Sequence, residues 1–210
     1  MKAPDWQAHW RDAWSGLGLG TPPLNRLEEL LARYREPQRH YHTLQHLDEC
    51  FAGYTQLREQ MRRPAEVALA LWYHDAVYEV RQHDNEARSA ALAAEALKSQ
   101  HAPPALASRI EALIMATRHH EAGPDHDATI LLDIDLAILG AAPERFAEYE
   151  AQIRAEYAHV PAHVYRERRR EVLDSFRRRA LLFKTTAFQT MFERQARENL
   201  DAAIRGQAGF

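Results

Sequence analysis

The sequence predicts an all-α fold, a single-domain helical bundle over residues 1–210, and three observations lead to it. Apolar residues recur at spacings of three and four along almost the whole chain, whereas the alternation typical of strands is hardly found. The composition favours helix, with many Ala, Leu, Glu and Arg against only 8 Gly and 10 Pro. With 46% hydrophobic and 27% charged residues, the chain has the composition of one ordinary globular domain and not of a disordered one.

Each expected helix is recognised by the apolar residues on one of its faces, and glycine or proline often separates it from the next. In chain order these faces carry Trp6, Trp10 and Trp14; Leu24, Leu27 and Leu31; Leu44, Leu47 and Phe51; Val67, Leu71 and Trp72; an alanine-rich stretch from about Asp84 to Leu97; Leu106, Ile110 and Leu113; Ile130 and Ile134; Phe146 and Ile153; Leu173 and Phe176; and Phe188, Phe192 and Leu200. The β-branched run at 130–136 could form a strand, but its flanks favour helix. The tryptophan stripe is interpreted as a docking face and not as a ligand site.

Charge, hydropathy and cysteine content limit the classes of protein to which this chain can belong. A net charge of −3 gives no general reason to expect a nucleic acid or a membrane as partner. No apolar run reaches the roughly 18 to 20 residues of a membrane span, and the N-terminus lacks the pattern of a secretory signal. The single cysteine, Cys50, excludes an internal disulfide and, among apolar neighbours, is interpreted as a buried structural thiol and not as a reactive one. We therefore expect a cytoplasmic protein.

The dipeptide His74-Asp75 is the strongest candidate for chemistry. It is one of three His-Asp pairs, at 74, 83 and 126, and only this one lies in an apolar stretch, from Leu69 to Tyr78. Ionisable side chains are rarely placed in such a stretch unless something compensates for their desolvation. A divalent metal does so, because it binds carboxylate and neutral imidazole together.

Two further segments combine metal-ligating residue types with apolar neighbours. His42 and His46 are spaced four apart, so on a helix they would project from one face, although a solvated helix start would also explain them. Asp133 and Asp135 lie in an apolar run, where an unpaired carboxylate is costly. Two positions apart on a helix they diverge, so one could coordinate a metal while the other caps or orients a neighbour.

The ordered set His … His-Asp … Asp on separate expected helices resembles the HD superfamily of metal-dependent phosphohydrolases. The stretch Tyr41-His42-Thr43-Leu44-Gln45-His46 is also similar to the Tyr-His-x-x-x-His stretch of its cyclic-nucleotide phosphodiesterase branch. An uncharacterised bacterial group of predicted HD phosphohydrolases is similar from about residue 39 through the C-terminal helices. The phrases that carry this similarity are Arg39-His40-Tyr41-His42, His74-Asp75-Ala76-Val77-Tyr78, Asp84-Asn85-Glu86 and Leu132-Asp133-Ile134-Asp135-Leu136.

The resemblance implies a helical hydrolase and a set of site residues. The implied metal ligands are His46, His74, Asp75 and Asp135. Asp135 is preferred to Asp133 because Ile134-Asp135-Leu136 is similar to the pattern around the family's last ligand. His42 would be the general acid or a contact to the substrate phosphate.

A mixed imidazole and carboxylate site suits Mn²⁺, Fe²⁺, Co²⁺, Ni²⁺ or Zn²⁺ better than Ca²⁺, and Mg²⁺ is possible. One or two such ions would polarise a phosphoryl group and lower the pKa of a coordinated water. The expected function is hydrolysis of a phosphate ester, as a phosphomonoesterase or phosphodiesterase. The expected substrate is a nucleotide or another small phosphorylated metabolite.

Three more residues have two interpretations each. His119 and His120 close an apolar helix where some relatives in the superfamily bind a second metal, so they could be metal ligands or phosphate contacts. They could equally be histidines placed at a helix C-terminus by the helix dipole. Asp84 is interpreted first as a helix N-cap and second as a carboxylate that orients the attacking water.

Two alternatives from other classes remain open at this point: a catalytically silent HD-type module that binds a nucleotide or a partner helix, and a di-iron oxygenase, which would need a second metal. The arginine-rich stretch at 166–179 alternates with acids at helical spacing, so it predicts a solvated face and not a nucleic-acid site. One or two of its arginines, or Lys184, could still reach a phosphate. The sequence does not predict an oligomeric state.

Overall fold

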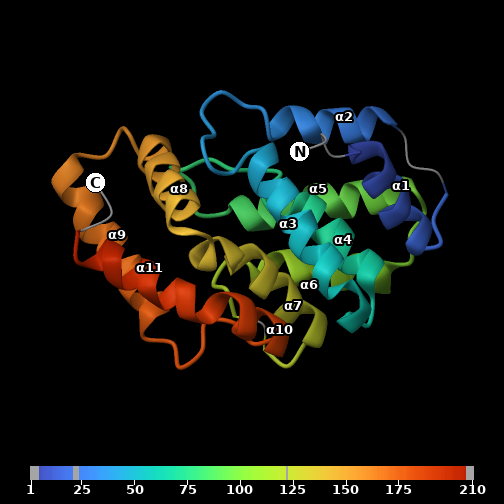
Figure 1. Cartoon of the computed structure of the whole chain (residues 1–210). Helices are drawn as coiled ribbons and strands as arrows, with labels where there is room; N and C mark the ends of the chain where they lie inside the picture. Colours follow the sequence, from blue (N-terminus) through green and yellow to red (C-terminus); the bar gives the residue numbers. More distant parts are fainter. Residues whose placement is uncertain (1–4, 21–23, 122, 207–210) are drawn as a thin grey trace. The chain divides into compact units, whose positions relative to one another are not determined.

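The computed structural model describes residues 5–20, 24–121 and 123–206 (Figure 1). All regular secondary structure in these residues is helical, which confirms the all-α class. None of the described helices combines the length and apolar character needed to cross a membrane. The run at 130–136, with its β-branched residues, lies in α7 (His126–Asp135) and the start of a 3₁₀ segment (Leu136–Gly140), so its flanks and not its β-propensity decide its structure.

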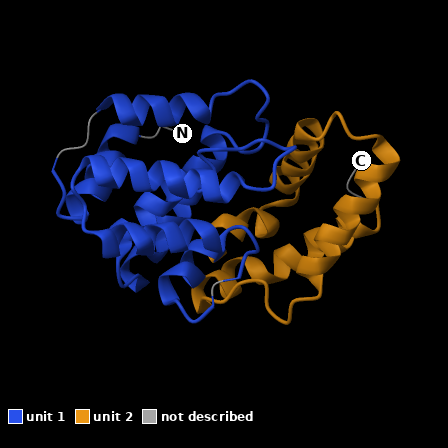
Figure 2. Cartoon of the chain, turned by 180° about the vertical axis from the view of Figure 1, so that it is seen from behind, with its two compact units in different colours: residues 1–132 blue, residues 133–210 orange. Residues whose placement is uncertain are grey.

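Contacts group the chain into two compact units, residues 1–132 and 133–210, shown in different colours in Figure 2. Unit 1 contains α1 (Trp6–Gly16), α2 (Leu24–Arg33), α3 (Leu44–Leu57), a 3₁₀ turn (Arg58–Gln60), α4 (Pro64–Tyr73), α5 (Asn85–Ser99), α6 (Pro104–Ala116) and most of α7. Unit 2 contains the end of α7, the 3₁₀ segment, α8 (Pro143–Glu156), α9 (Ala162–Arg177), α10 (Thr186–Phe188), a π-helical turn (Gln189–Glu193) and α11 (Arg194–Ile204). A single domain over 1–210 stays a prediction.

Helix α4 is the centre of unit 1. Its sequence is almost wholly apolar, and every residue from Glu66 to Tyr73 is buried. It is surrounded by α1, α3, α5 and α6, all of which contact it (Figure 1). A helix that is apolar on all sides requires neighbours on all sides, so this arrangement follows directly from its composition.

The tryptophan stripe docks α1 onto α4. Trp10 and Trp14 are fully buried, and the Trp10 ring meets the Trp72 ring edge-on with their centroids 5.5 Å apart. Edge-to-face aromatic pairs stabilise such a contact beyond their burial alone. The interpretation of this stripe as a docking face is therefore confirmed.

In unit 2, α9 packs along α11, and aromatic rings fill the space near α10. The Phe188 ring lies 4.9 Å from the Phe192 ring and 6.1 Å from the Phe183 ring. Gly140 is required beside them, because a Cβ there would lie 2.8 Å from the Phe192 carbonyl oxygen.

The arginine-rich stretch of α9 forms the solvated, ion-paired face that its spacing predicts. Arg168 pairs with Glu171 and Arg178 pairs with Asp174, at 2.9 and 2.5 Å, and both arginines are more than three-quarters exposed. Arg169 is the exception, since it is directed inward to a buried ion pair with Glu150 on α8.

Candidate metal centre

Three potential metal-ligating atoms meet in unit 1. The Nε2 atoms of His46 and His74 lie 3.1 Å apart. The Oδ2 atom of Asp75 lies 3.0 Å from the His74 Nε2 and 3.4 Å from the His46 Nε2. Helix α3 supplies His46, and the C-cap of α4 with the turn after it supplies His74 and Asp75, 28 and 29 positions later in the sequence.

The end of α4 sets the positions of His74 and Asp75. The helix ends at Tyr73, and His74 occupies its C-cap, with its backbone N–H bonded to the Ala70 carbonyl at 2.8 Å. Asp75 follows in a turn and not in the helix, which lets its carboxylate turn back to the His74 ring. The apolar stretch that contains the His-Asp pair thus continues beyond the helix, which ends two residues before Asp75.

A backbone contact fixes the tautomer of His74. Its Nδ1 lies 2.8 Å from the Leu71 carbonyl oxygen, which can only accept a hydrogen bond. The Nδ1 atom therefore carries a proton, and the lone pair of the neutral ring lies on Nε2, which faces His46 and Asp75. A second contact of this kind is typical of metal-ligating histidines.

Asp75 is held in its ionised form. Burial alone would raise the pKa of its carboxyl, but in the metal-free protein the charges of the protonated His74 and His42 rings and hydrogen bonds from His46 and His74 outweigh it and hold the pKa well below its usual range. The carboxylate is thus ready to ligate a cation at neutral pH.

The spacing of the three atoms fits one divalent ion. Ligands held about 2.1 Å from an ion lie roughly 3.0 Å apart in an octahedral shell and roughly 3.4 Å apart in a tetrahedral one. The three observed separations, 3.0, 3.1 and 3.4 Å, span this interval. The separations among His46, His74 and Asp75 are therefore those of three ligands around one metal ion.

Cys50 lies beside this cluster. It is buried, as expected, and its Sγ lies 3.7 and 3.8 Å from the two ring nitrogens of His46, one turn earlier on α3. The potential ligand atoms of Cys50, His46 and His74 all lie within 4.8 Å of one another. The sequence interpretation missed this proximity, although the i, i+4 spacing of His46 and Cys50 indicates it.

His42 does not lie on a helix with His46. Thr43 is the N-cap of α3, so His42 precedes the helix and the helical argument for pairing the two histidines is wrong. The loop nevertheless brings the His42 ring to 5.9 Å from the His46 ring. There it stacks on Tyr78 at a centroid distance of 3.8 Å, so its position is fixed by an aromatic neighbour.

Arg39 ties the His42 loop to the Asp75 turn. Its guanidinium is buried and donates to the carbonyl oxygens of Asp75 at 2.6 Å, Ala76 at 3.0 Å and His42 at 3.3 Å. It also lies 5.4 Å from the Tyr34 ring centroid. One side chain thus fixes the backbone on both sides of the candidate ligands, a role that sequence patterns do not reveal.

Within unit 2, Asp133 and Asp135 have different surroundings. The Asp133 carboxylate is buried and accepts the backbone N–H groups of Lys184 at 2.9 Å and Thr185 at 2.6 Å. Burial raises the pKa of Asp133, and these donors offset only part of that rise. Asp135 is half-buried at the end of α7. The structure thus gives Asp133 the orienting role that the sequence left open between the two.

The remaining candidates lie in loops of unit 1. Asp84 is exposed at the N-cap position of α5, where its side chain makes no capping hydrogen bond. His119 is exposed in the turn that follows α6, and His120 is half-buried there with a φ of 51°. A role for these three in catalysis or in a second metal site stays a prediction.

No protein-family model matches this chain, and no curated protein or solved structure is similar to it at a significant level.

Proposed function

We propose that this chain is a metal-dependent phosphohydrolase of the HD-domain type. The observation that carries the proposal is the convergence of His46, His74 and Asp75 at separations that suit one divalent transition metal. The all-helical fold agrees with this family, and the similarity of the sequence motifs supports it. Asp135 as a fourth ligand is part of the same proposal and rests on the motif alone.

The residues of unit 1 supply the other requirements of such a reaction. The low pKa of Asp75 and the fixed tautomer of His74 keep two ligands in the form that binds a cation. A bound ion would polarise a phosphoryl group and make an attacking water more acidic. His42, held against Tyr78 near the cluster, can donate a proton to the leaving oxygen of the substrate.

Metal analysis of the purified protein, followed by a phosphate-release screen across nucleotides and sugar phosphates, tests this proposal. We expect bound or readily loaded Mn²⁺, Fe²⁺, Co²⁺, Ni²⁺ or Zn²⁺ and hydrolysis that a chelator abolishes. His74→Ala should abolish both, whereas His163→Ala, at an exposed position on α9, should change neither. Tight metal binding without hydrolysis of any substrate would instead support a silent binding module. If the protein neither binds metal nor hydrolyses any of these substrates, the proposal is wrong.

A further inference from the structure

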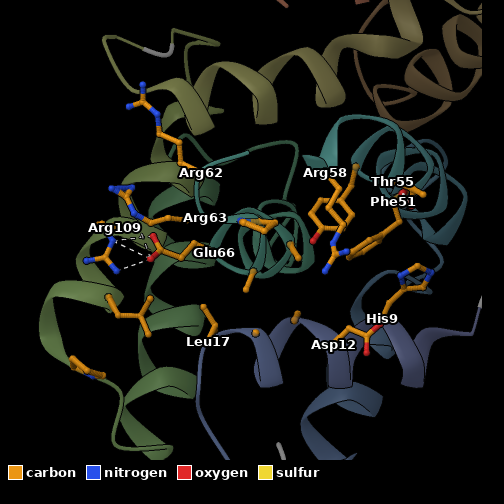
Figure 3. A pocket seen from close by; sticks show the side chains of 18 of the residues that line it. His9, Asp12, Leu17, Phe51, Thr55, Arg58, Arg62, Arg63, Glu66 and Arg109 are labelled. Carbon is orange, nitrogen blue, oxygen red and sulfur yellow. Dashed lines mark hydrogen bonds and ion pairs between the residues drawn. The ribbon is translucent and has the colours of Figure 1, made fainter. Parts of the chain in front are cut away.

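A cavity of about 710 Å³ lies in unit 1 at the beginning of α4 (Figure 3). Residues of α1, α3, α4 and the start of α6 line it, together with the turns that precede α4. None of His46, His74 and Asp75 is among them. Ala68 is the residue of α4 on the cavity wall that is nearest in sequence to His74, and the six positions from one to the other correspond to about 9 Å along the helix at a rise of about 1.5 Å per residue.

The lining is strongly cationic. Four arginines line the cavity, Arg58, Arg62, Arg63 and Arg109, against two carboxylates, Asp12 and Glu66. The difference, four minus two, leaves two positive charges in excess. Cations gathered in one concave surface repel one another and concentrate anions from solution.

Internal ion pairs account for only part of this charge. The buried Glu66 carboxylate accepts hydrogen bonds of 2.9 and 2.5 Å from the Arg109 guanidinium. The Nε atom of Arg63 lies 3.9 Å from the same carboxylate. Figure 3 shows this group on one side of the cavity and Arg58 on the opposite side. Arg58 makes a side-chain hydrogen bond with Tyr54, a contact that raises the pKa of the guanidinium.

The backbone that carries two of these arginines is anchored. The buried carboxylate of Asp127 accepts the N–H groups of Arg62 and Arg63, each at 2.8 Å. On the other side Gly16 lets α1 approach closely, because a Cβ there would lie 2.8 Å from the Ala65 Cβ. The arginine side chains therefore extend from a rigid base, which lowers the entropic cost of binding a ligand.

We propose that this cavity binds a phosphorylated small molecule, with Arg58 and Arg63 as its principal contacts. Guanidinium groups match phosphate oxygens in geometry and form charge-assisted hydrogen bonds with them. The volume falls in the range of about 300 to 1,000 Å³ that small-molecule sites occupy, and it exceeds what a phosphate group needs. The organic part of the ligand has room beside His9 and Tyr54.

Isothermal titration of metal-free protein with inorganic pyrophosphate at low ionic strength tests this site. We expect saturable binding at one site per chain that weakens as salt is added. Arg58→Gln and Arg63→Gln should each weaken binding at least about tenfold, because each removes a charged contact to phosphate. Arg194→Gln, at an exposed position on α11 with a side chain 87% exposed, is the matched control and should bind like the wild type.

Further measurements separate this site from the metal centre and from general charge attraction. Circular dichroism should show that each variant is folded, because Arg58 and Arg63 are both exposed. Asp75→Asn should leave pyrophosphate binding by metal-free protein unchanged. The site would be overturned by an absence of binding, by binding insensitive to both arginine changes, by an equal loss in Arg194→Gln, or by loss in Asp75→Asn. This test measures binding and not hydrolysis, so its result stands even if the protein proves not to be a phosphohydrolase.

Discussion

The Arg39 guanidinium connects the backbone on both sides of the candidate metal ligands, and the substitution Arg39→Lys tests this role. Lysine keeps the positive charge but loses the planar fork that reaches three carbonyl oxygens, those of His42, Asp75 and Ala76. A single ammonium can retain one of these bonds in the same space. Two carbonyls in buried or partly buried positions then lose a charged donor.

The expected cost follows from these contacts. A hydrogen bond to a charged donor contributes about 1.5 kcal/mol or more, so the loss of two should lower the free energy of unfolding by about 3 kcal/mol. Metal affinity should fall by about 10- to 100-fold, because groups behind the ligands determine how well the ligands are oriented. Urea denaturation of metal-free protein measures the first effect, and competition titration with Zn²⁺ measures the second.

Arg88→Lys is the matched control in the same unit. Arg88 pairs with Glu79 at the surface, where both side chains are about half exposed, so its replacement should change stability by less than about 0.5 kcal/mol and leave metal affinity unchanged. If Arg39→Lys lowers stability but binds Zn²⁺ as tightly as the wild type, Arg39 does not position the ligands. If neither quantity changes, the guanidinium contacts themselves are wrong.

Three other changes test separate parts of the structure. The Cys50 thiol is almost equally far from both His46 nitrogens, so it does not face Nε2 specifically. Cys50→Ala should therefore leave the absorption spectrum of the Co²⁺-loaded protein unchanged. Loss of a thiolate charge-transfer band in this variant would show that Cys50 coordinates the metal. Glu193→Gln should cost about 1 to 2 kcal/mol at pH 7, since the carboxylate accepts N–H groups of Leu182 and Phe183. Burial alone would raise the pKa of Glu193, but these bonds and Arg197 lower it below 4.5, so this contribution is full above that pH and is lost as pH falls through the lowered value. A difference between wild type and Glu193→Gln that stays constant in urea melts down to pH 3 would refute it. Asp127→Ala should cost about 2 to 3 kcal/mol by removing the acceptor of two N–H groups, and a thermal melt unchanged from wild type would contradict that.

Periodicity is a good guide to the helices of this chain because burial of an apolar face determines most of them. The apolar run that ends in Trp72 predicts a buried central helix, and α4 is one. Helix ends are harder to predict. His42 and Asp75 both fall just outside a helix, because caps and turns depend on local hydrogen bonds such as that from Gln45 N–H to the Thr43 side chain.

The sequence likewise indicates some residues of the candidate site and not others. Residue type and apolar context single out His46 and His74-Asp75, since an ionisable group in a core requires compensation. The sequence does not reveal the role of Arg39, because its acceptors are backbone carbonyls, which every residue type has. Without the family pattern it also does not decide between Asp133 and Asp135, because the N–H groups that bind Asp133 come from residues 51 and 52 positions later.

The central claim is that His46, His74 and Asp75 hold one metal ion. Equilibrium dialysis of wild-type protein and Asp75→Asn against Mn²⁺ and Zn²⁺ tests it most directly, with Glu198→Gln as a control at an exposed carboxylate on α11. We predict that Asp75→Asn binds one ion fewer per chain than the wild type, or binds it at least about 100-fold more weakly, while Glu198→Gln binds normally. Equal stoichiometry and affinity in wild type and Asp75→Asn would contradict the assignment of this centre.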